Sequence, residues 1–169
     1  MRVIMGVDPS TKTGVVIIKG DEVLYQGTIR SNTDNYLTNG FVIAQELVRL
    51  INEYEVDYVC LENYAMNARF RIVDMVTLGT VIRFFLLERQ YFASGFNEVF
   101  EIYQLEPLTL KKWATKKGGA KKADMKRHAK AKGFTGNNDE VDAFFLAKYL
   151  QAGVELSLLD LKETNWLTM

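Results

Sequence analysis

The chain has 169 residues, of which 48% are hydrophobic and 12% aromatic. That is enough to bury one sizeable core and too little for two ordinary domains. Its 21 basic residues balance its 21 acidic residues, so net charge alone indicates no polyanionic partner. A single cysteine excludes an internal disulfide, and no segment reaches about 18 uncharged apolar residues, as a membrane-spanning helix would. We therefore expect one cytoplasmic domain that does not associate with membranes.

The N-terminal part of the chain predicts three antiparallel strands. Residues 3–7 form a short apolar run that ends at Asp8, and residues 13–18 form a second run rich in β-branched side chains. Turn residues join these two runs, and Gly20 and Asp21 form another turn signal before a third run over 22–29. The three runs predict a meander.

Helices and strands alternate through the rest of the chain. Residues 36–54 place apolar side chains at steps of three and four, which predicts an amphipathic helix, and residues 56–61 predict a strand covered on both faces. Further predictions are a long helix over 72–92, a strand over 99–105, and helices over 108–115, 122–132 and 139–151. The predicted fold is α/β, a central five-stranded mixed sheet flanked by helices.

Four carboxylates stand where a metal site can form. Asp8 and Glu62 each end a strand that is otherwise apolar, and a buried carboxylate is costly unless something pairs with it. Asp139 and Asp142 are three residues apart at the start of the last helix, so both project from one face of its first turn. We refer to these four residues as the carboxylate set.

Each member of the set also has an ordinary structural explanation. Asp8 can hydrogen-bond a turn backbone, Glu62 can be a solvated strand end, and acids at a helix N-terminus are stabilised by capping and by the helix dipole. Together, however, the four suit Mg²⁺, with Mn²⁺ as a substitute. Two ions would suit phosphodiester hydrolysis, one generating the hydroxide and the other stabilising the leaving oxygen.

Basic residues concentrate in one stretch although the total charge is zero. Ten of the 21 lie within residues 111–132, which contain a single acid, Asp124. Lysine and arginine contacts with phosphates supply most of the affinity of proteins for DNA. The stretch therefore predicts a nucleic-acid contact, the alternative being a solvated lysine-rich helix face.

The acidic motifs resemble those of a known family. Residues 6–14 (G-V-D-P-S-T-K-T-G), 60–63 (C-L-E-N) and 139–144 (D-E-V-D-A-F) are similar, in order and separation, to motifs of the RuvC-type Holliday-junction resolvases of the RNase H-like superfamily. The resemblance spans roughly residues 1–150. It implies an RNase H-like domain over residues 1–153 and leaves residues 154–169 as a tail of unknown role. Within the family, the chain is a candidate for a phage-type member.

This resemblance implies an endonuclease that resolves Holliday junctions and other branched DNA by paired symmetric nicks. The carboxylate set would hold two Mg²⁺ ions and catalyse the reaction together with Lys111 and Lys122, which would lie near the scissile phosphate. The expected DNA contacts are Lys111, Lys112, Lys116, Lys117, Lys121, Lys122, Tyr64, Arg69 and Phe70. Where the family often has an aromatic wedge, this chain has Ala65. Either Tyr64 or Phe70 substitutes for the wedge, or the substrate preference is relaxed towards forks and flaps.

The helix over 72–92 carries apolar residues on more than one face. A homodimer would bury the second face, and the resemblance implies dimerisation through a helix in this position. The competing explanation is that another helix of the same chain covers it.

Three other functions compete with the resolvase hypothesis. An actin- or sugar-kinase-like nucleotide-binding domain would need a second related domain and a glycine-rich phosphate loop, and this chain has neither. A non-catalytic protein that binds branched DNA would not need all four carboxylates. An RNase H-like nuclease acting on RNA–DNA hybrids or structured RNA stays open, and hybrid substrates would distinguish it.

Overall fold

The structure is a computed structural model that describes residues 1–31, 33–63, 72–92 and 100–155. One five-stranded sheet has the order β3-β2-β1-β4-β5. Its strands are β1 (Val3–Asp8), β2 (Lys12–Lys19), β3 (Glu22–Arg30), β4 (Tyr58–Glu62) and β5 (Glu101–Leu105). The first three pair antiparallel, while β4 pairs parallel with β1 and β5 pairs parallel with β4. The predicted mixed sheet is confirmed.

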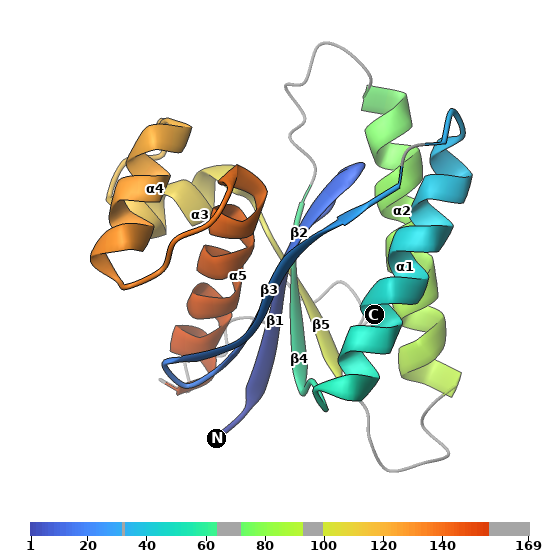
Figure 1. Cartoon of the computed structure of the whole chain (residues 1–169), viewed down its shortest axis with the longest axis horizontal. Coiled ribbons are helices and arrows are strands. Elements are labelled where there is room, and N and C mark those ends of the chain that lie inside the picture. Colours follow the sequence, from blue (N-terminus) through green and yellow to red (C-terminus); the bar gives the residue numbers. More distant parts are fainter. Residues whose placement is uncertain (32, 64–71, 93–99, 156–169) are drawn as a thin grey trace.

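Helices cover both faces of this sheet (Figure 1). On one side lie α1 (Tyr36–Glu53) and α2 (Ile72–Phe92), and on the other lie α3 (Pro107–Thr115), α4 (Lys122–Ala131) and α5 (Asn138–Glu155). All predicted helices are present. The last helix continues to Glu155, beyond the expected domain boundary at residue 153, and the rest of the expected tail lies outside the described residues.

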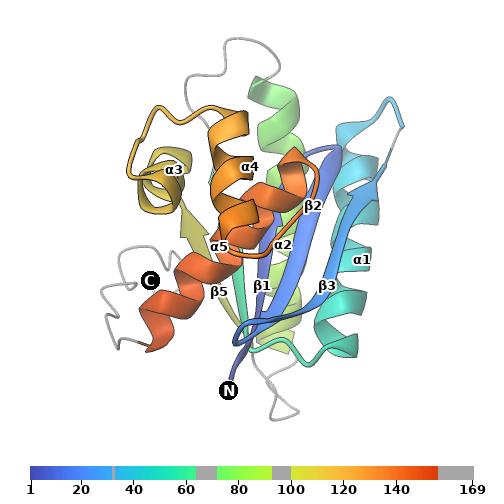
Figure 2. The same cartoon turned by 60° about the vertical axis from the view of Figure 1, so that its left-hand side comes forward.

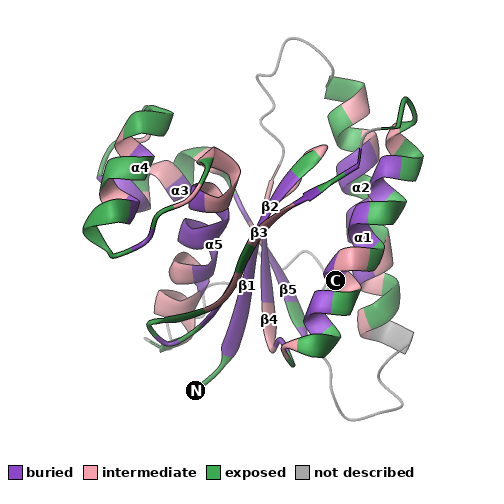
Figure 3. Ribbon diagram, viewed as in Figure 1, coloured by how far each residue is buried: buried purple, intermediate pink, exposed green. Residues whose placement is uncertain are grey.

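The strands β1 and β2 are buried on both faces (Figure 3). Met5 and Ile17 pack into the core under α1 and α2, while Ile4, Val16 and Ile18 pack into the core under α5. Because successive side chains of a strand point to opposite faces, two buried faces require apolar residues at consecutive positions. That requirement explains the continuous apolar runs in the sequence.

The helix α5 lies directly on the backbone of the two central strands (Figure 2). A Cβ atom on Gly6 would be 2.0 Å from the carbonyl oxygen of Ala143, and one on Gly14 would be 2.2 Å from the carbonyl oxygen of Asp139. Only glycine permits so close an approach. The two glycines thereby bring the first turn of α5 against the end of β1.

The second apolar face of α2 is partly covered within the chain. Gly40 of α1 approaches Leu78 and Val81 so closely that a Cβ there would meet Val81 at 2.8 Å. The large apolar side chains of α2 that remain exposed are Ile72, Val73, Met75, Val76 and Phe84. Packing within the chain therefore accounts for only part of the apolar surface of α2.

None of the described helices is long and apolar enough to cross a membrane.

Candidate active site

The carboxylate set gathers at one end of the sheet. Asp8 ends β1, Glu62 ends the neighbouring parallel strand β4, and the first turn of α5 carries Asp139 and Asp142. Parallel strands place their carboxyl ends at the same edge, where ligands of α/β proteins bind. The charges of the other three members all act on the pKa of Asp8, so the four behave as one electrostatic unit.

Burial and mutual repulsion raise the pKa values within the set. The pKa of Asp8 is raised well above its ordinary value, first by burial and then by the charges of Glu62, Asp142 and Asp139. Burial also raises the pKa of Glu62 to about 7 and that of Asp142 to about 6. The neighbouring Glu62 carboxyl helps to raise the pKa of Asp8, while Asp8 acts to lower the pKa of Glu62 against the larger effect of burial. A bound cation would favour the ionised forms and release protons.

The turn after β1 is held by residues other than Asp8. The Thr13 hydroxyl donates to the carbonyl oxygen of Ser10 at 2.6 Å and accepts from the Ser10 N–H at 3.1 Å, while the Ser10 hydroxyl oxygen accepts from the Lys12 N–H at 3.0 Å. These bonds satisfy the turn backbone locally. The explanation of Asp8 as a turn residue is therefore wrong.

Asn137 caps α5 in place of the two aspartates. Its side-chain oxygen accepts from the backbone N–H of Asp139 at 2.9 Å and of Glu140 at 3.0 Å. Within the described part of the chain, the carboxylates of Asp139 and Asp142 make no hydrogen bond or ion pair. Because Asn137 satisfies the backbone of the first turn, the explanation of the aspartates as capping residues is also wrong.

The two lysines predicted at the scissile phosphate stand beside the set. The charges of Lys111 in α3 and Lys122 at the start of α4 lower the pKa values of Glu62 and Asp142, against the larger effect of burial. The other predicted lysines, Lys112, Lys116, Lys117 and Lys121, are exposed on the same segment. Tyr64, Ala65, Arg69 and Phe70 lie outside the described residues.

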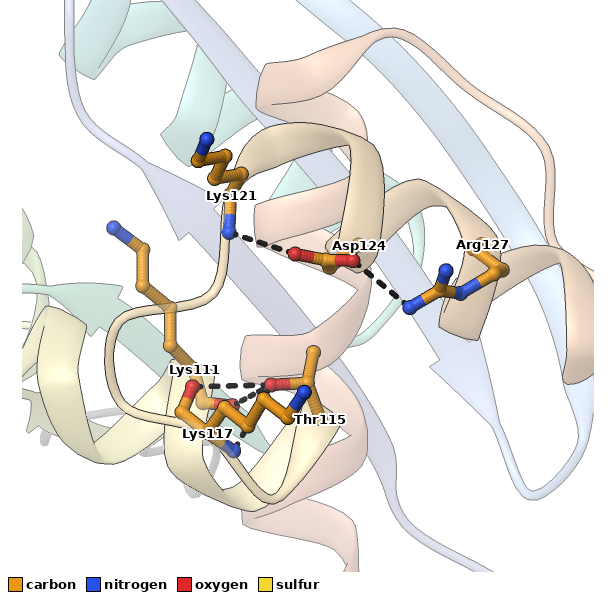
Figure 4. Close-up of polar contacts among 6 residues, drawn as sticks. All are labelled: Lys111, Thr115, Lys117, Lys121, Asp124 and Arg127. Carbon is orange, nitrogen blue, oxygen red and sulfur yellow. Dashed lines mark hydrogen bonds and ion pairs between the residues drawn. The ribbon is translucent and has the colours of Figure 1, made fainter.

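Hydrogen bonds hold the basic loop between α3 and α4 at both ends (Figure 4). The Thr115 hydroxyl donates to the carbonyl oxygen of Lys111 at 2.8 Å and accepts from the N–H of Lys117 at 3.2 Å. At the other end, Asp124 accepts from the N–H of Lys121 at 3.2 Å and from Arg127 at 2.8 Å. The single acid of this stretch therefore fixes the helix start that carries Lys122.

Arg83 holds the end of β4, and no sequence pattern predicted this role. Its side chain is buried and donates to the carbonyl oxygen of Glu62 at 2.9 Å, to the Gln104 side chain at 3.1 Å and to the carbonyl oxygen of Gly79 at 3.0 Å. It links α2, β4 and β5 where Glu62 leaves the sheet. An arginine inside the otherwise apolar run at 81–87 was the available signal.

The donor set fits a hard divalent cation in its chemistry. All four donors are carboxylates, the ligands that Mg²⁺ and Mn²⁺ prefer. Burial, with repulsion between neighbouring carboxylates, raises the pKa values of Asp8, Glu62 and Asp142, and a bound cation would favour their ionised forms. Among the described residues, however, no three acidic, histidine or cysteine side chains are already close enough to enclose one ion.

No protein-family model and no curated protein sequence matches the chain. RuvC from Thermus thermophilus matches in structure with a TM-score of 0.69 and 14% identity, over 92% of this chain and 96% of that one. The chain has the RuvC fold.

Two further structures show the same fold. Thermus thermophilus RuvC in complex with a Holliday junction substrate matches with a TM-score of 0.71 and 13% identity, over 92% of this chain and 96% of that one. The yeast mitochondrial Holliday junction resolvase Ydc2 matches with a TM-score of 0.64 and 10% identity, over 95% of this chain and 85% of that one. At such identities the likeness establishes the fold, and function has to be argued from the site.

Proposed function

We propose that this chain is a metal-dependent endonuclease that resolves Holliday junctions and related branched DNA. The observation that carries the proposal is the convergence of four carboxylates and two lysines at one end of the RuvC fold. The proposal is supported by Thermus thermophilus RuvC, a protein of the same fold that has been solved with a Holliday junction substrate.

The carboxylate set would hold the metal, and four carboxylates are enough for two Mg²⁺ ions that share ligands and keep some water. When bound, Mg²⁺ supplies the positive charge that stabilises the phosphoryl oxygens during displacement. Lys111 and Lys122 would orient the scissile phosphate against the set, and the exposed lysines of the loop would bind the flanking backbone. Because the pKa values of Asp8, Glu62 and Asp142 are raised, protons would compete with the ion for these carboxylates up to a higher pH than for free carboxyl groups.

The proposal is tested with a labelled immobile four-way DNA junction in Mg²⁺, compared with a linear duplex of the same sequence. The wild type should make paired symmetric nicks in the junction only. Asp142→Asn should lower the cleavage rate by roughly 1,000-fold, the equivalent of about 4 kcal/mol of lost transition-state stabilisation, and should leave junction affinity within about threefold. Cleavage is measured by gel electrophoresis and affinity by fluorescence anisotropy.

The same assay distinguishes the competing functions. A chain that binds the junction but cuts it in neither Mg²⁺ nor Mn²⁺ would be a non-catalytic DNA-binding protein, and the catalytic proposal would fail. A chain that cuts an RNA–DNA hybrid and spares the junction would be an RNase H-like nuclease on another substrate. Cleavage of forks and flaps beside the junction would define the range of branched substrates.

We also propose that the exposed apolar side chains of α2 form a homodimer interface. Val73 is 74% exposed and Phe84 is 61% exposed, and such residues lose unfavourable contact with water when a second copy covers them. Two copies would also supply the two active sites that paired nicks require.

Phe84→Glu tests the dimer by placing a charge in the proposed interface. It should weaken self-association by about 30-fold or more and convert paired nicks into single nicks. Sedimentation equilibrium measures the first effect and the ratio of nicked to resolved junction the second. Val23→Glu, at a half-exposed apolar position on β3, serves as the matched control and should change neither. A wild type that stays monomeric at all concentrations would exclude the dimer.

A further inference from the structure

Three aligned residues lie under the first turn of α5. Asp8 of β1 pairs with Gly14 of β2, and Gly14 pairs with Thr28 of β3. Neighbouring strands are about 4.8 Å apart, so the row spans roughly 10 Å from Asp8 to Thr28. The backbone of Asp139 rests on the middle of this row, because a Cβ on Gly14 would lie 2.2 Å from its carbonyl oxygen.

The far end of the row is hydrogen-bonded to α5 through Glu140. Its Oε1 atom accepts from the Thr28 hydroxyl at 3.0 Å and from the Asn137 side-chain amide at 2.8 Å, while Oε2 accepts from the Asn137 N–H at 3.1 Å. The Asn137 amide also donates to the Thr28 hydroxyl oxygen at 2.7 Å. Three side chains from the edge strand and the helix start thus form one closed network.

Glu140 differs in role from the two acids that flank it in D-E-V-D. The Glu140 carboxylate accepts hydrogen bonds from Thr28 and Asn137, whereas the carboxylates of Asp139 and Asp142 have no such partner among the described residues. Asn137 joins the two roles, because the same side chain that binds Glu140 and Thr28 also caps the helix through its oxygen.

We propose that Thr28, Asn137 and Glu140 form a clamp whose function is to position Asp139 and Asp142 relative to Asp8 for metal binding. This inference rests on the proposed function of the carboxylate set. In this proposal Thr28, Asn137 and Glu140 contact neither the metal nor the DNA, so they are positioning residues. The first turn of a helix frays readily, and a frayed turn would let the two aspartates move away from the strand that carries Asp8.

The clamp predicts an effect on metal affinity that does not depend on charge. Thr28→Val keeps the shape of the side chain and removes the hydroxyl that bonds Glu140 and Asn137. We expect the dissociation constant for Mn²⁺, measured by isothermal titration calorimetry on the DNA-free chain, to rise about three- to tenfold. The metal concentration for half-maximal cleavage should rise by the same factor, while the rate at saturating metal stays within about twofold.

Gln26→Ala is the matched control. Gln26 lies two residues away on the same strand and donates to the carbonyl oxygen of Thr135 at 3.2 Å, so it ties β3 to the same loop without touching the clamp. Its removal should leave the Mn²⁺ dissociation constant unchanged. If both variants lose the same thermal stability but only Thr28→Val loses metal affinity, the effect belongs to positioning and not to general weakening of the fold.

A graded series at Glu140 gives an independent check. In Glu140→Gln the amide oxygen can still accept from Thr28 and Asn137, but its NH₂ group cannot accept from the Asn137 N–H, so an intermediate effect is expected. Glu140→Ala should weaken Mn²⁺ binding further. In the Thr28→Val background Glu140→Ala should have a smaller effect than alone, because the two share bonds.

Separate outcomes overturn the clamp and the proposed function. A wild type that binds Mn²⁺ and cuts junctions, with Thr28→Val binding Mn²⁺ as tightly as wild type and Gln26→Ala, refutes the clamp alone. A wild type that neither binds Mn²⁺ nor cuts branched DNA refutes the proposed function, and the clamp with it.

Discussion

Asp8→Asn is expected to make the metal-free chain more stable while it lowers Mg²⁺-dependent junction cleavage by roughly 1,000-fold or more. The gain in stability follows from the raised pKa of Asp8, which shows that burial and three neighbouring charges disfavour its ionised form. An asparagine has nearly the same shape and no charge. At neutral pH we therefore expect the variant to have a higher Tm than the wild type in the absence of metal.

Asp57→Asn provides a control of opposite sign. Asp57 accepts from Arg2 at 2.7 Å and from the N–H of Val3 at 2.7 Å at the opposite end of the sheet, so its charge has favourable partners. The same chemical change should lower stability there and leave cleavage unchanged. Thermal unfolding in EDTA and the junction assay measure both variants. A lower Tm for Asp8→Asn would show that its carboxylate is not under electrostatic strain.

The second large effect is a loss of stability of the metal-free chain as the pH rises. The pKa of Asp142 is raised to about 6 and that of Glu62 to about 7, so between their unfolded and folded pKa values the folded chain binds more protons than the unfolded chain. The contribution of these two groups to the free energy of unfolding is therefore largest below about pH 4, and it is lost as the pH rises through about 6 to 7. From Asp142 we expect a loss of about 2 kcal/mol, or about 4 to 8 °C in Tm.

Mg²⁺ should reverse this loss, because it binds the ionised carboxylates of the folded chain. At a concentration about 100 times its dissociation constant the ion would add about 2.7 kcal/mol. The measurement is Tm against pH, from about pH 5 to about pH 8, in EDTA and in Mg²⁺. The pKa values of Asp21 and Glu46 are lowered by Lys148 and Arg49, so their contributions are lost only at more acid pH. A flat profile in EDTA would contradict the raised pKa values.

The carboxylates themselves could be found from the sequence, because each stands at the end of a recognisable strand or at the start of a recognisable helix. Asp8 and Glu62 end apolar strands, and a short apolar run can be recognised directly in the sequence. What the sequence could not decide was whether Asp8 held a turn or whether Asp139 and Asp142 capped a helix. Those alternatives depend on which neighbour takes the backbone bonds, and in the structure Thr13 and Asn137 take them.

The roles of the residues that support the site could not be predicted from the sequence, for a related reason. Arg83 and Thr28 act through partners far away in the sequence, Arg83 on Glu62 and Thr28 on Glu140. Such pairs leave no local spacing signal, and an arginine in an apolar helix or a threonine in a strand is common in other proteins.

By itself, then, the sequence determined the order of strands and helices, the mixed α/β class and the identity of the acidic and basic residues, since hydrophobic periodicity and turn residues act over short stretches of chain. The tertiary structure decided which of those residues share one electrostatic environment. Only the register of β1, β2 and β3, and the contact of α5 with Gly6 and Gly14, place Asp8 beside Asp139 and Asp142. Desolvation and repulsion depend on distance in space, and the fold sets that distance.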